Sequence, residues 1–164
     1  MAAVSIVPAT SEEAIAQVRD LFVDYADGVG FDLCFQDFGR ELAELPADYA
    51  PPGGALLLAR CDSAVAGCVA LRRLDEQSCE MKRMYVRPEY RGQQIGRKLA
   101  RAVIAAARRI GYRRMRLDTL PSMEPAIELY RSLGFREIAP YRDNPIQGAL
   151  FFELDLDEGK GERP

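Results

Sequence analysis

An amphipathic helix is predicted from Gln93 to Ile110, and its apolar stripe is the strongest constraint that the chain places on its fold. The stripe residues recur every three or four positions: Ile95, Leu99, Ala102, Val103, Ala106 and Ile110. Gly111 follows as the expected C-cap. Apolar strand patterns lie on either side of this helix, at residues 79–86 and 114–119. A helix with one apolar face must cover another apolar surface, so helices layered on a sheet are expected.

The rest of the chain alternates between strand and helix patterns. Strands are expected at residues 4–9, 55–60, 65–71, 135–139 and 149–156. Helices are expected after the capping box Thr10-Ser-Glu-Glu13 until Gly28 and Gly30, and over residues 35–45 and 125–133. Helices return between strands only in the second half, which favours hairpins first and crossovers later. We therefore predict an α/β (α+β) fold: one domain over residues 1–156, with a mixed, mostly antiparallel sheet of about six to seven strands and about four helices. Residues 157–164 are expected to form a polar tail.

Composition excludes several kinds of chemistry. The chain contains no histidine, which rules out a Ser-His-Asp triad, a Cys-His pair and histidine-ligated zinc. A general base must then be Asp, Glu, Tyr or a water held by them. The four cysteines form no CxxC pair and are expected to be small buried apolar residues rather than reactive thiols, so no metal is predicted. No secretory signal or membrane-spanning run is visible, which favours a cytoplasmic location without membrane attachment.

Charge is distributed unevenly along the chain. Residues 82–116 contain twelve basic residues and one acidic residue, Glu89, although the whole chain has a net charge of −3. Such a region suits a compact polyanionic ligand. For Arg101, Arg108 and Arg109, a solvated helix face is the simpler interpretation. Nucleic-acid binding is disfavoured, because the basic segment has neither interleaved aromatic residues nor a known binding motif.

A short turn joins the strand at 79–86 to the long helix. It reads Arg91-Gly-Gln-Gln-Ile-Gly96, and it leaves the unpaired amides and positive dipole of the helix N-terminus facing the turn. Such a site accepts phosphate oxygens, and Gly92 and Gly96 would let a ligand approach the backbone. A P-loop would need GK followed by Ser or Thr, and a dinucleotide fingerprint would need GxGxxG after the first strand of a βαβ unit. Both are absent.

This turn resembles the acetyl-CoA-binding segment of the GNAT superfamily of N-acetyltransferases. The family pattern is Arg or Gln, two residues, glycine, one residue, then glycine or alanine. Here Gln94 stands at the middle glycine, which is tolerable if its backbone stays helical. The segment from Ala126 through Tyr130 to Gly134-Phe135 resembles a second family motif, and the hairpin 64–70 resembles the family's second and third strands. The resemblance covers residues 4–156. An inactive CoA-binding regulatory domain is the alternative, because of Gln94 and because Met123 replaces a usual asparagine.

The resemblance implies a binding site for acetyl-CoA as cosubstrate. The fourth and fifth strands should splay apart, with the backbone of Met84 and Val86 pairing with the pantetheine arm. The pyrophosphate should lie on the amides of residues 91–96, with charge from Arg91 or Arg97. The cofactor-binding residues implied are Met84, Tyr85, Val86, Arg91, Gly92, Gln93, Gln94, Ile95, Gly96 and Arg97.

The resemblance also implies direct transfer of the acetyl group to a primary amine in a ternary complex. Tyr130 would protonate the leaving thiolate; the alternative is a packing tyrosine. Glu80 would be the base, unless it pairs with Lys82 or a cross-strand arginine; Asp118 and an ordered water are the other candidates. The acidic remainder of the protein favours a cationic amine. A homodimer is possible. Candidates for the acceptor site, by element position, are Phe31, Asp32, Cys34, Phe35, Tyr141, Asp143 and Asn144.

Overall fold

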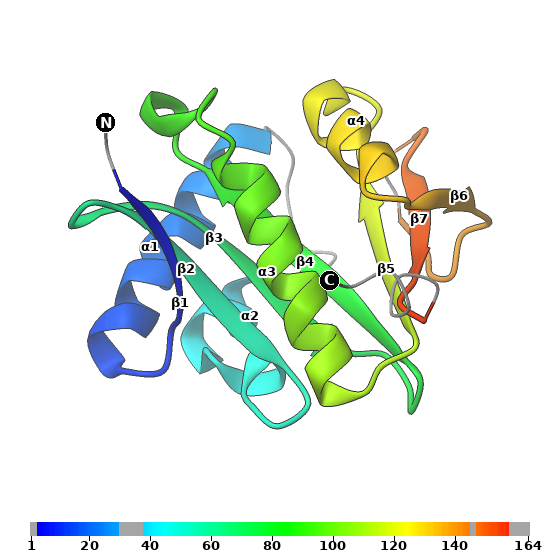
Figure 1. Cartoon of the computed structure of the whole chain (residues 1–164), viewed down its shortest axis with the longest axis horizontal. Helices are drawn as coiled ribbons and strands as arrows, with labels where there is room; N and C mark the ends of the chain where they lie inside the picture. Colours follow the sequence, from blue (N-terminus) through cyan, green and yellow to red (C-terminus); the bar gives the residue numbers. More distant parts are fainter. Residues whose placement is uncertain (1–2, 30–37, 145–146, 158–164) are drawn as a thin grey trace.

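The computed structural model describes residues 3–29, 38–144 and 147–157 (Figure 1). Its helices and strands follow one another in the predicted order, with boundaries that differ by a few residues at most. The elements are β1 (Val4–Pro8), α1 (Glu12–Val29), α2 (Phe38–Glu44), β2 (Ala55–Cys61), β3 (Ala64–Arg73), β4 (Ser78–Val86), α3 (Ile95–Ile110), β5 (Arg114–Thr119), α4 (Glu124–Ser132), β6 (Arg136–Ile138) and β7 (Leu150–Asp155).

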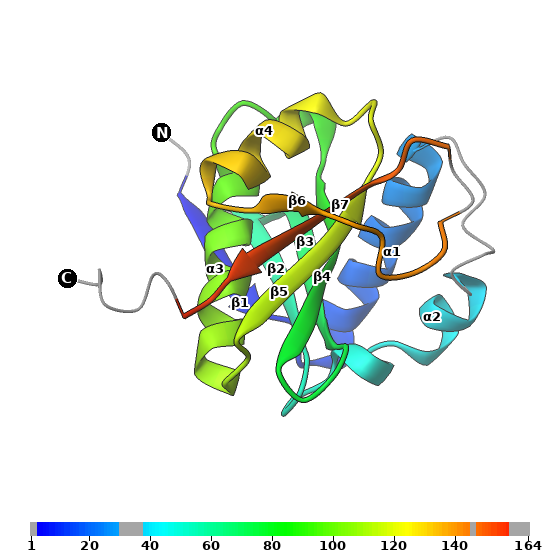
Figure 2. The same ribbon diagram turned by 90° about the vertical axis from the view of Figure 1, so that its right-hand side faces the viewer.

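The strands form one sheet in the order β1-β2-β3-β4-β5-β7-β6. Neighbours are antiparallel except β4 and β5, which are parallel and joined by α3. This confirms the predicted mixed sheet, with hairpins in the first half of the chain and crossovers in the second. Figure 2 views the molecule from the side of β5, β6 and β7.

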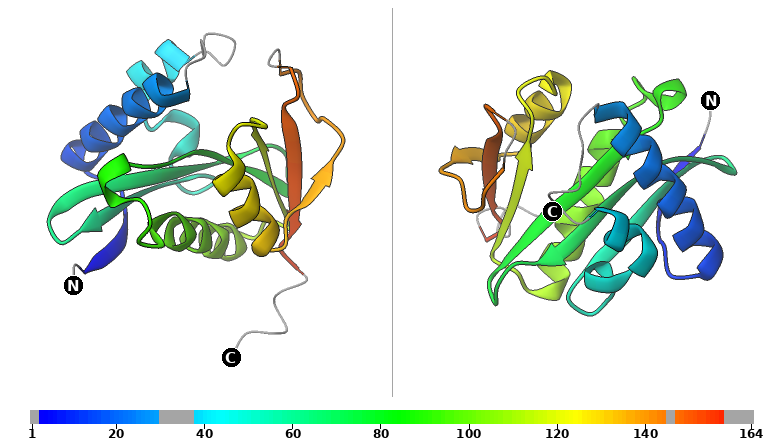
Figure 3. Two further views of the ribbon diagram at one scale, coloured as in Figure 1. Left: turned by 90° about the horizontal axis from the view of Figure 1, so that it is seen from above. Right: turned by 180° about the vertical axis from the view of Figure 1, so that it is seen from behind.

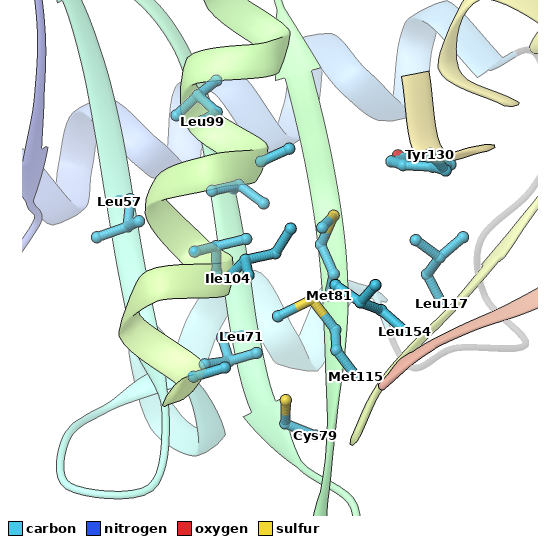
Figure 4. Packing of buried hydrophobic residues seen from close by; sticks show 14 of the residues in the cluster. Leu57, Leu71, Cys79, Met81, Leu99, Ile104, Met115, Leu117, Tyr130 and Leu154 are labelled. Atoms are coloured by element: carbon cyan, nitrogen blue, oxygen red, sulfur yellow. The ribbon is translucent and has the colours of Figure 1, made fainter. Parts of the chain in front are cut away.

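The helices cover both faces of the sheet (Figure 3). The face under α3 and α4 holds the larger apolar cluster, in which Leu99 and Ile104 of α3 pack with Met81 and Met115 of the sheet (Figure 4). The smaller cluster lies under α1 and includes Phe22. Among the described residues, no helix is long and apolar enough to cross a membrane.

Three of the cysteines are buried free thiols, as predicted: Cys61, Cys68 and Cys79. Burial raises the pKa of the Cys68 and Cys79 thiols, so both stay protonated and unreactive. Cys34 lies outside the described residues.

The start of α1 differs by one residue from the predicted capping box. The Ser11 hydroxyl, not that of Thr10, accepts a hydrogen bond from the Ala14 amide, at 3.1 Å, and the helix begins at Glu12. Either hydroxyl could serve as N-cap, and only the path of the entering chain decides between them. The helix type and position were correct.

A β-bulge in β4 overturns the simple alternation expected for this strand. The pairing moves from Cys68–Tyr85 to Ala70–Lys82, which leaves one extra residue on β4, and Arg83 adopts a φ of 59°. As a result Met84 lies on the α3 face with Met81, whereas Arg83 joins Lys82 on the opposite face. Strict alternation of side chains would place Arg83 on the same face as Met81. The sequence pattern alone does not reveal the inserted residue that changes this.

The pairing between β4 and β5 ends early. Only residues 78–80 of β4 pair with residues 114–116 of β5, and beyond them the two strands separate (Figure 1). The predicted splay is therefore present, and it leaves the β5-facing side of β4 from Met81 to Val86 without a neighbouring strand.

Candidate active site

A cavity of about 1000 Å³ occupies the gap between β4 and β5. Its wall is formed by β4, the turn before α3, the end of β5, and parts of α4 and α1. The predicted site residues that line it are Met84, Tyr85, Val86, Arg91, Gly92, Gln94, Ile95, Gly96, Arg97, Asp118, Tyr130 and Asn144. One cavity thus brings together residues from elements far apart in the sequence.

One end of the cavity is built from backbone groups at the N-terminus of α3. The amide of Lys98 is bonded to the Gln94 carbonyl at 3.0 Å, so the amides of residues 95–97 precede the first intrahelical bond of α3. The Arg91 guanidinium is held at the same end, because its Nε donates to the Val86 carbonyl at 2.9 Å. The amides that precede the first helical bond, the helix dipole and the Arg91 guanidinium together form a site that suits an anion.

The backbone of Gln94 is not helical, contrary to expectation. Its φ of 65° and ψ of 17° lie in the left-handed region, at the N-cap of α3. The turn therefore keeps the conformation that suits a glycine, and a residue with a Cβ accepts the strain. Gly96, in contrast, is inside the helix, where a Cβ would meet Leu129 at an ordinary 3.7 Å.

Gln93 is not among the residues that line the cavity. Its side-chain oxygen lies 4.0 Å from the Cys61 sulfur, away from the gap between β4 and β5. In the turn, the cavity therefore has Arg91, Gly92 and Gln94 on its wall but not Gln93.

Tyr130 reaches the cavity from α4. The residue is buried, and its ring lies 5.7 Å from that of Phe135, centroid to centroid. Burial raises the pKa of its hydroxyl, and Tyr25 and Asp118 add to the shift. The hydroxyl therefore stays protonated at ordinary pH values, and the raised pKa makes it a weaker acid than a free tyrosine.

Glu80 lies outside the cavity wall, in a buried ion cluster. Its carboxylate accepts from Arg72 Nε at 2.8 Å and from the Tyr141 hydroxyl at 2.7 Å, and it forms an ion pair with Arg142. Arg72 stands directly across from it on β3. These contacts fix the loop between β6 and β7 to the sheet.

Asp118 is the predicted carboxylate that does line the cavity, near the end of β5. Its Oδ2 accepts from the Asn144 amide at 3.2 Å, so the β6–β7 loop also reaches the site. Tyr141 and Asp143 do not line the cavity. The other predicted acceptor-site residues, Phe31, Asp32, Cys34 and Phe35, lie outside the described residues.

Three further residues at this end were missed by sequence reasoning: Tyr25, Lys82 and Arg83. Arg83 forms a bidentate ion pair with Glu41 of α2, at 2.9 and 3.0 Å, and its guanidinium lies 5.7 Å from the centre of the Tyr25 ring. The bulge at Arg83 brings Arg83, Glu41 and Tyr25 together. The two adjacent cations in a mostly buried strand are the one sequence signal that could have indicated them.

Comparison with known proteins agrees with this geometry. Residues 15–135 match the model of the Acetyltransferase (GNAT) family, and the chain belongs to that family. An uncharacterized N-acetyltransferase of Schizosaccharomyces pombe is 41% identical over 138 residues, covering 83% of this chain and 85% of the relative. N-acetylaspartate synthetase of Danio rerio is 32% identical over 123 residues, covering 70% of this chain and 44% of that protein.

Solved structures share the fold. The acetyltransferase yncA of Salmonella typhimurium, solved with acetyl-CoA, superposes with a TM-score of 0.74 at 24% identity, covering 95% of each chain. The sheet order, the splayed strands and the helices on both faces are thus those of a GNAT acetyltransferase.

Proposed function

We propose that this protein transfers the acetyl group of acetyl-CoA directly to a primary amine, with both substrates bound in one ternary complex. The observation that carries the proposal is the continuity of the cavity. The cavity extends from the amides at the N-terminus of α3 to the polar side chains of Lys82, Asp118 and Asn144, and Tyr130 also lies on its wall. A covalent acyl-enzyme is not expected, because the described cysteines are buried and none of them is among the residues that line the cavity.

The residues at the α3 end fit a CoA pyrophosphate. The amides of residues 95–97 would receive phosphate oxygens, with Arg91 and Arg97 adding positive charge. The backbone of Met84 and Val86 borders the gap where β5 has left β4, and this edge would pair with the amides of the pantetheine arm. When bound, acetyl-CoA supplies a thioester whose carbon–sulfur bond is replaced by a carbon–nitrogen bond to the amine. The acceptor's ammonium gives up two protons, one before its nitrogen attacks and one as the amide forms. The thiolate that leaves takes up one proton, and the other passes through a base to solvent.

Tyr130 is the proposed donor of the proton to the thiolate. Its hydroxyl carries the proton, and its position on the cavity wall is fixed by burial. Because burial raises its pKa, the proton would have to pass to the thiolate in concert with cleavage of the carbon–sulfur bond. A packing tyrosine would also be buried, so substitution by phenylalanine is the test.

The proton of the acceptor amine requires a base. Of the two predicted carboxylates, Asp118 lines the cavity, whereas Glu80 is bound to Arg72, Arg142 and Tyr141 outside it. These contacts favour Asp118, directly or through water, as the base. The catalytic role of Glu80 stays a prediction, and its observed contacts suit a residue that positions the β6–β7 loop.

The relatives support an amine as acceptor. The S. pombe relative is named an N-acetyltransferase, and the zebrafish relative, as its name states, makes N-acetylaspartate. For the present chain, the substrate class proposed is a small primary amine that reaches the side-chain end of the cavity.

A screen of amines with acetyl-CoA tests the proposal. Purified protein is incubated with acetyl-CoA and a panel of amino acids, polyamines, peptides and aromatic amines, and CoA release is corrected for hydrolysis without acceptor. At least one amine should give saturable, protein-dependent release together with the acetylated product. CoA binding by calorimetry without turnover of any amine would instead support the inactive regulatory domain.

A further inference from the structure

The loop between β6 and β7 is attached to the sheet at two points. The Tyr141 hydroxyl donates a hydrogen bond to the Glu80 carboxylate of β4, at 2.7 Å. Three residues later, the Asn144 amide donates to the Asp118 carboxylate of β5, at 3.2 Å. The described part of this loop, residues 139–144, is therefore held against both strands that border the cavity.

The two attachment points lie on either side of the place where β4 and β5 separate. Glu80 is the last residue of β4 that pairs with β5, and its partner there is Arg116. Asp118 lies two residues further along β5, beyond the paired region, and it lines the cavity. Alternate residues of a strand share a face, so Arg116 and Asp118 point to the same side of the sheet. Residues 141–144 therefore run from the closed end of the gap towards its open part.

Tyr141 is held in place from several sides. Its ring lies edge-on against Phe151 of β7, with the ring centroids 5.3 Å apart, and the Arg116 guanidinium lies 5.7 Å from its centre. The carboxylate that accepts its hydrogen bond belongs to a fully buried residue, Glu80, which two arginines also contact. Burial raises the pKa of the Tyr141 hydroxyl, and Asp118 adds to the shift, so the hydroxyl keeps its proton and remains the donor.

The second attachment acts on the proposed base itself. Asn144 and Asp118 both line the cavity, and the hydrogen bond between them engages one oxygen of the Asp118 carboxylate. A general base must lie within hydrogen-bond reach of the proton that it removes, and a displacement of about 1 Å can lower a rate by about 100-fold. The orientation of this carboxylate therefore depends on where the loop places Asn144.

We infer that Tyr141 is a positioning residue for the transfer reaction: its bond to Glu80 fixes the β6–β7 loop, and through Asn144 the loop orients the Asp118 carboxylate towards the acceptor amine. This inference rests on the proposed acetyltransferase function and adds to it a residue that lies outside the cavity wall. Glu80 then contributes to catalysis without touching either substrate.

A double-mutant cycle tests the inference by kinetics. Tyr141→Phe removes only the hydroxyl and keeps the ring against Phe151, so kcat should fall about tenfold while the KM for acetyl-CoA changes by less than about twofold. Asn144→Ala should lower kcat by at least as much. Because both changes act on the same carboxylate, the double variant should lose no more than the larger of the two single losses.

Tyr112→Phe is the matched control. Tyr112 is also buried, and its hydroxyl donates to the Gly53 carbonyl at 2.6 Å, but it is not among the residues that line the cavity. This variant should lose a little thermal stability, as Tyr141→Phe should, and keep full kcat. Full kcat in Tyr141→Phe, an equal loss in Tyr112→Phe, or a double variant that shows the product of the two single losses would overturn the inference while leaving the acetyltransferase intact.

A spectroscopic measurement follows the loop directly. Asn144 is the only asparagine of the chain, so protein labelled with a nitrogen isotope in the asparagine side chain gives the NMR signal of this one amide group. Asp118→Ala removes the acceptor and shows how far the signal moves when the bond is lost. Tyr141→Phe should move the signal in the same direction, and Tyr112→Phe should leave it in place. A signal that does not move in Tyr141→Phe would overturn the inference.

A protein that acetylates no amine would overturn the proposed function instead. The attachment of the loop is then judged from the spectra alone. Movement of the Asn144 signal in Tyr141→Phe but not in Tyr112→Phe supports the link from Tyr141 to Asp118, and equal signals in wild type and Tyr141→Phe overturn it.

Discussion

The two ends of the cavity are lined by different kinds of groups, backbone at one end and side chains at the other. At the α3 end, the wall consists of backbone and glycines from one short stretch, residues 91, 92 and 94–97, with the Arg91 and Arg97 side chains beside them. At the other end, the groups are side chains that come from four separate elements: Tyr25, Lys82, Asp118 and Asn144. The first end depends on local conformation, and the second depends on how distant elements pack.

This difference suggests that the two ends of the cavity have different functions. Backbone amides at a helix N-terminus bind phosphate whatever the side chains are, so that end suits a cosubstrate shared by a whole family. Side chains brought together by packing can be replaced one at a time without disturbing the backbone end. We therefore expect substitutions at the side-chain end to change catalysis and acceptor choice, and those at the backbone end to change CoA affinity.

The largest effect is expected from Glu80→Gln. The change leaves Arg72 and Arg142 facing a neutral amide in a buried cluster, which should lower the free energy of unfolding by about 3 kcal/mol at neutral pH. Urea unfolding measures this loss. Asp118→Asn is the matched variant, and it should keep most of the stability while removing the acidic limb of the pH–rate profile. A stable Glu80→Gln enzyme that lacks the acidic limb would return the role of base to Glu80.

Tyr130→Phe should come next. The ring and its contact with Phe135 remain, but the proton donor is lost, so kcat should fall about 100-fold, equivalent to about 2.7 kcal/mol. CoA affinity and thermal stability should barely change. Steady-state kinetics with calorimetric CoA binding as control measures both quantities, and an enzyme with full kcat would make Tyr130 a packing residue.

Gly96→Asp tests the backbone end. A Cβ at this position would meet only Leu129 and Val86 at ordinary distances, and an aspartate is favourable in the first turn of a helix, so the variant should fold. Its carboxylate would repel phosphate and raise the Kd for CoA more than tenfold, or more than about 1.4 kcal/mol. Gly96→Ala adds the Cβ without the charge and should bind more tightly than the aspartate variant. Unchanged CoA affinity in Gly96→Asp would show that the pyrophosphate does not bind at the N-terminus of α3.

Lys82 gives a pH-dependent effect on stability. Its pKa is about 7 in the folded protein against about 10.5 when unfolded, because burial disfavours the charge. Between these values the unfolded chain binds more protons, so Lys82 contributes a stability that rises with pH by up to about 1.4 kcal/mol per unit. Lys82→Met should therefore be more stable than wild type at pH 7, with the difference shrinking towards pH 10. Lys98→Met, at an exposed lysine of α3, should show no such trend in the same urea titrations.

Gln94→Gly should have the smallest effect. Glycine adopts the left-handed conformation of this position without strain, so unfolding should cost about 1 kcal/mol more. The neighbouring Gln93 has no positive φ, and Gln93→Gly should instead lower stability slightly. Thermal unfolding compares the two, and a less stable Gln94→Gly protein would mean that the Gln94 side chain contributes more than its strained backbone costs.

Local patterns were enough to predict the elements and the backbone end of the site. The apolar stripe from Ile95 to Ile110 predicted α3, and the turn at 91–96 predicted an anion site, because both depend on residues adjacent in the chain. The order of these elements also predicted a mixed sheet, since a parallel pair requires a crossover between its strands. For these features, each residue's neighbours in the sequence are also its neighbours in space.

The acceptor end was decided by the tertiary structure. No pattern of period two predicts that an extra residue at Arg83 turns this side chain to the side of Lys82, or that Asn144 meets Asp118 across 26 positions. Glu80 shows the same limit: the family resemblance implied a catalytic base at this position, whereas the fold surrounds the carboxylate with two arginines and a tyrosine. Bulges and long-range ion pairs depend on which elements pack together, and the free energy that selects them belongs to the whole fold rather than to any segment.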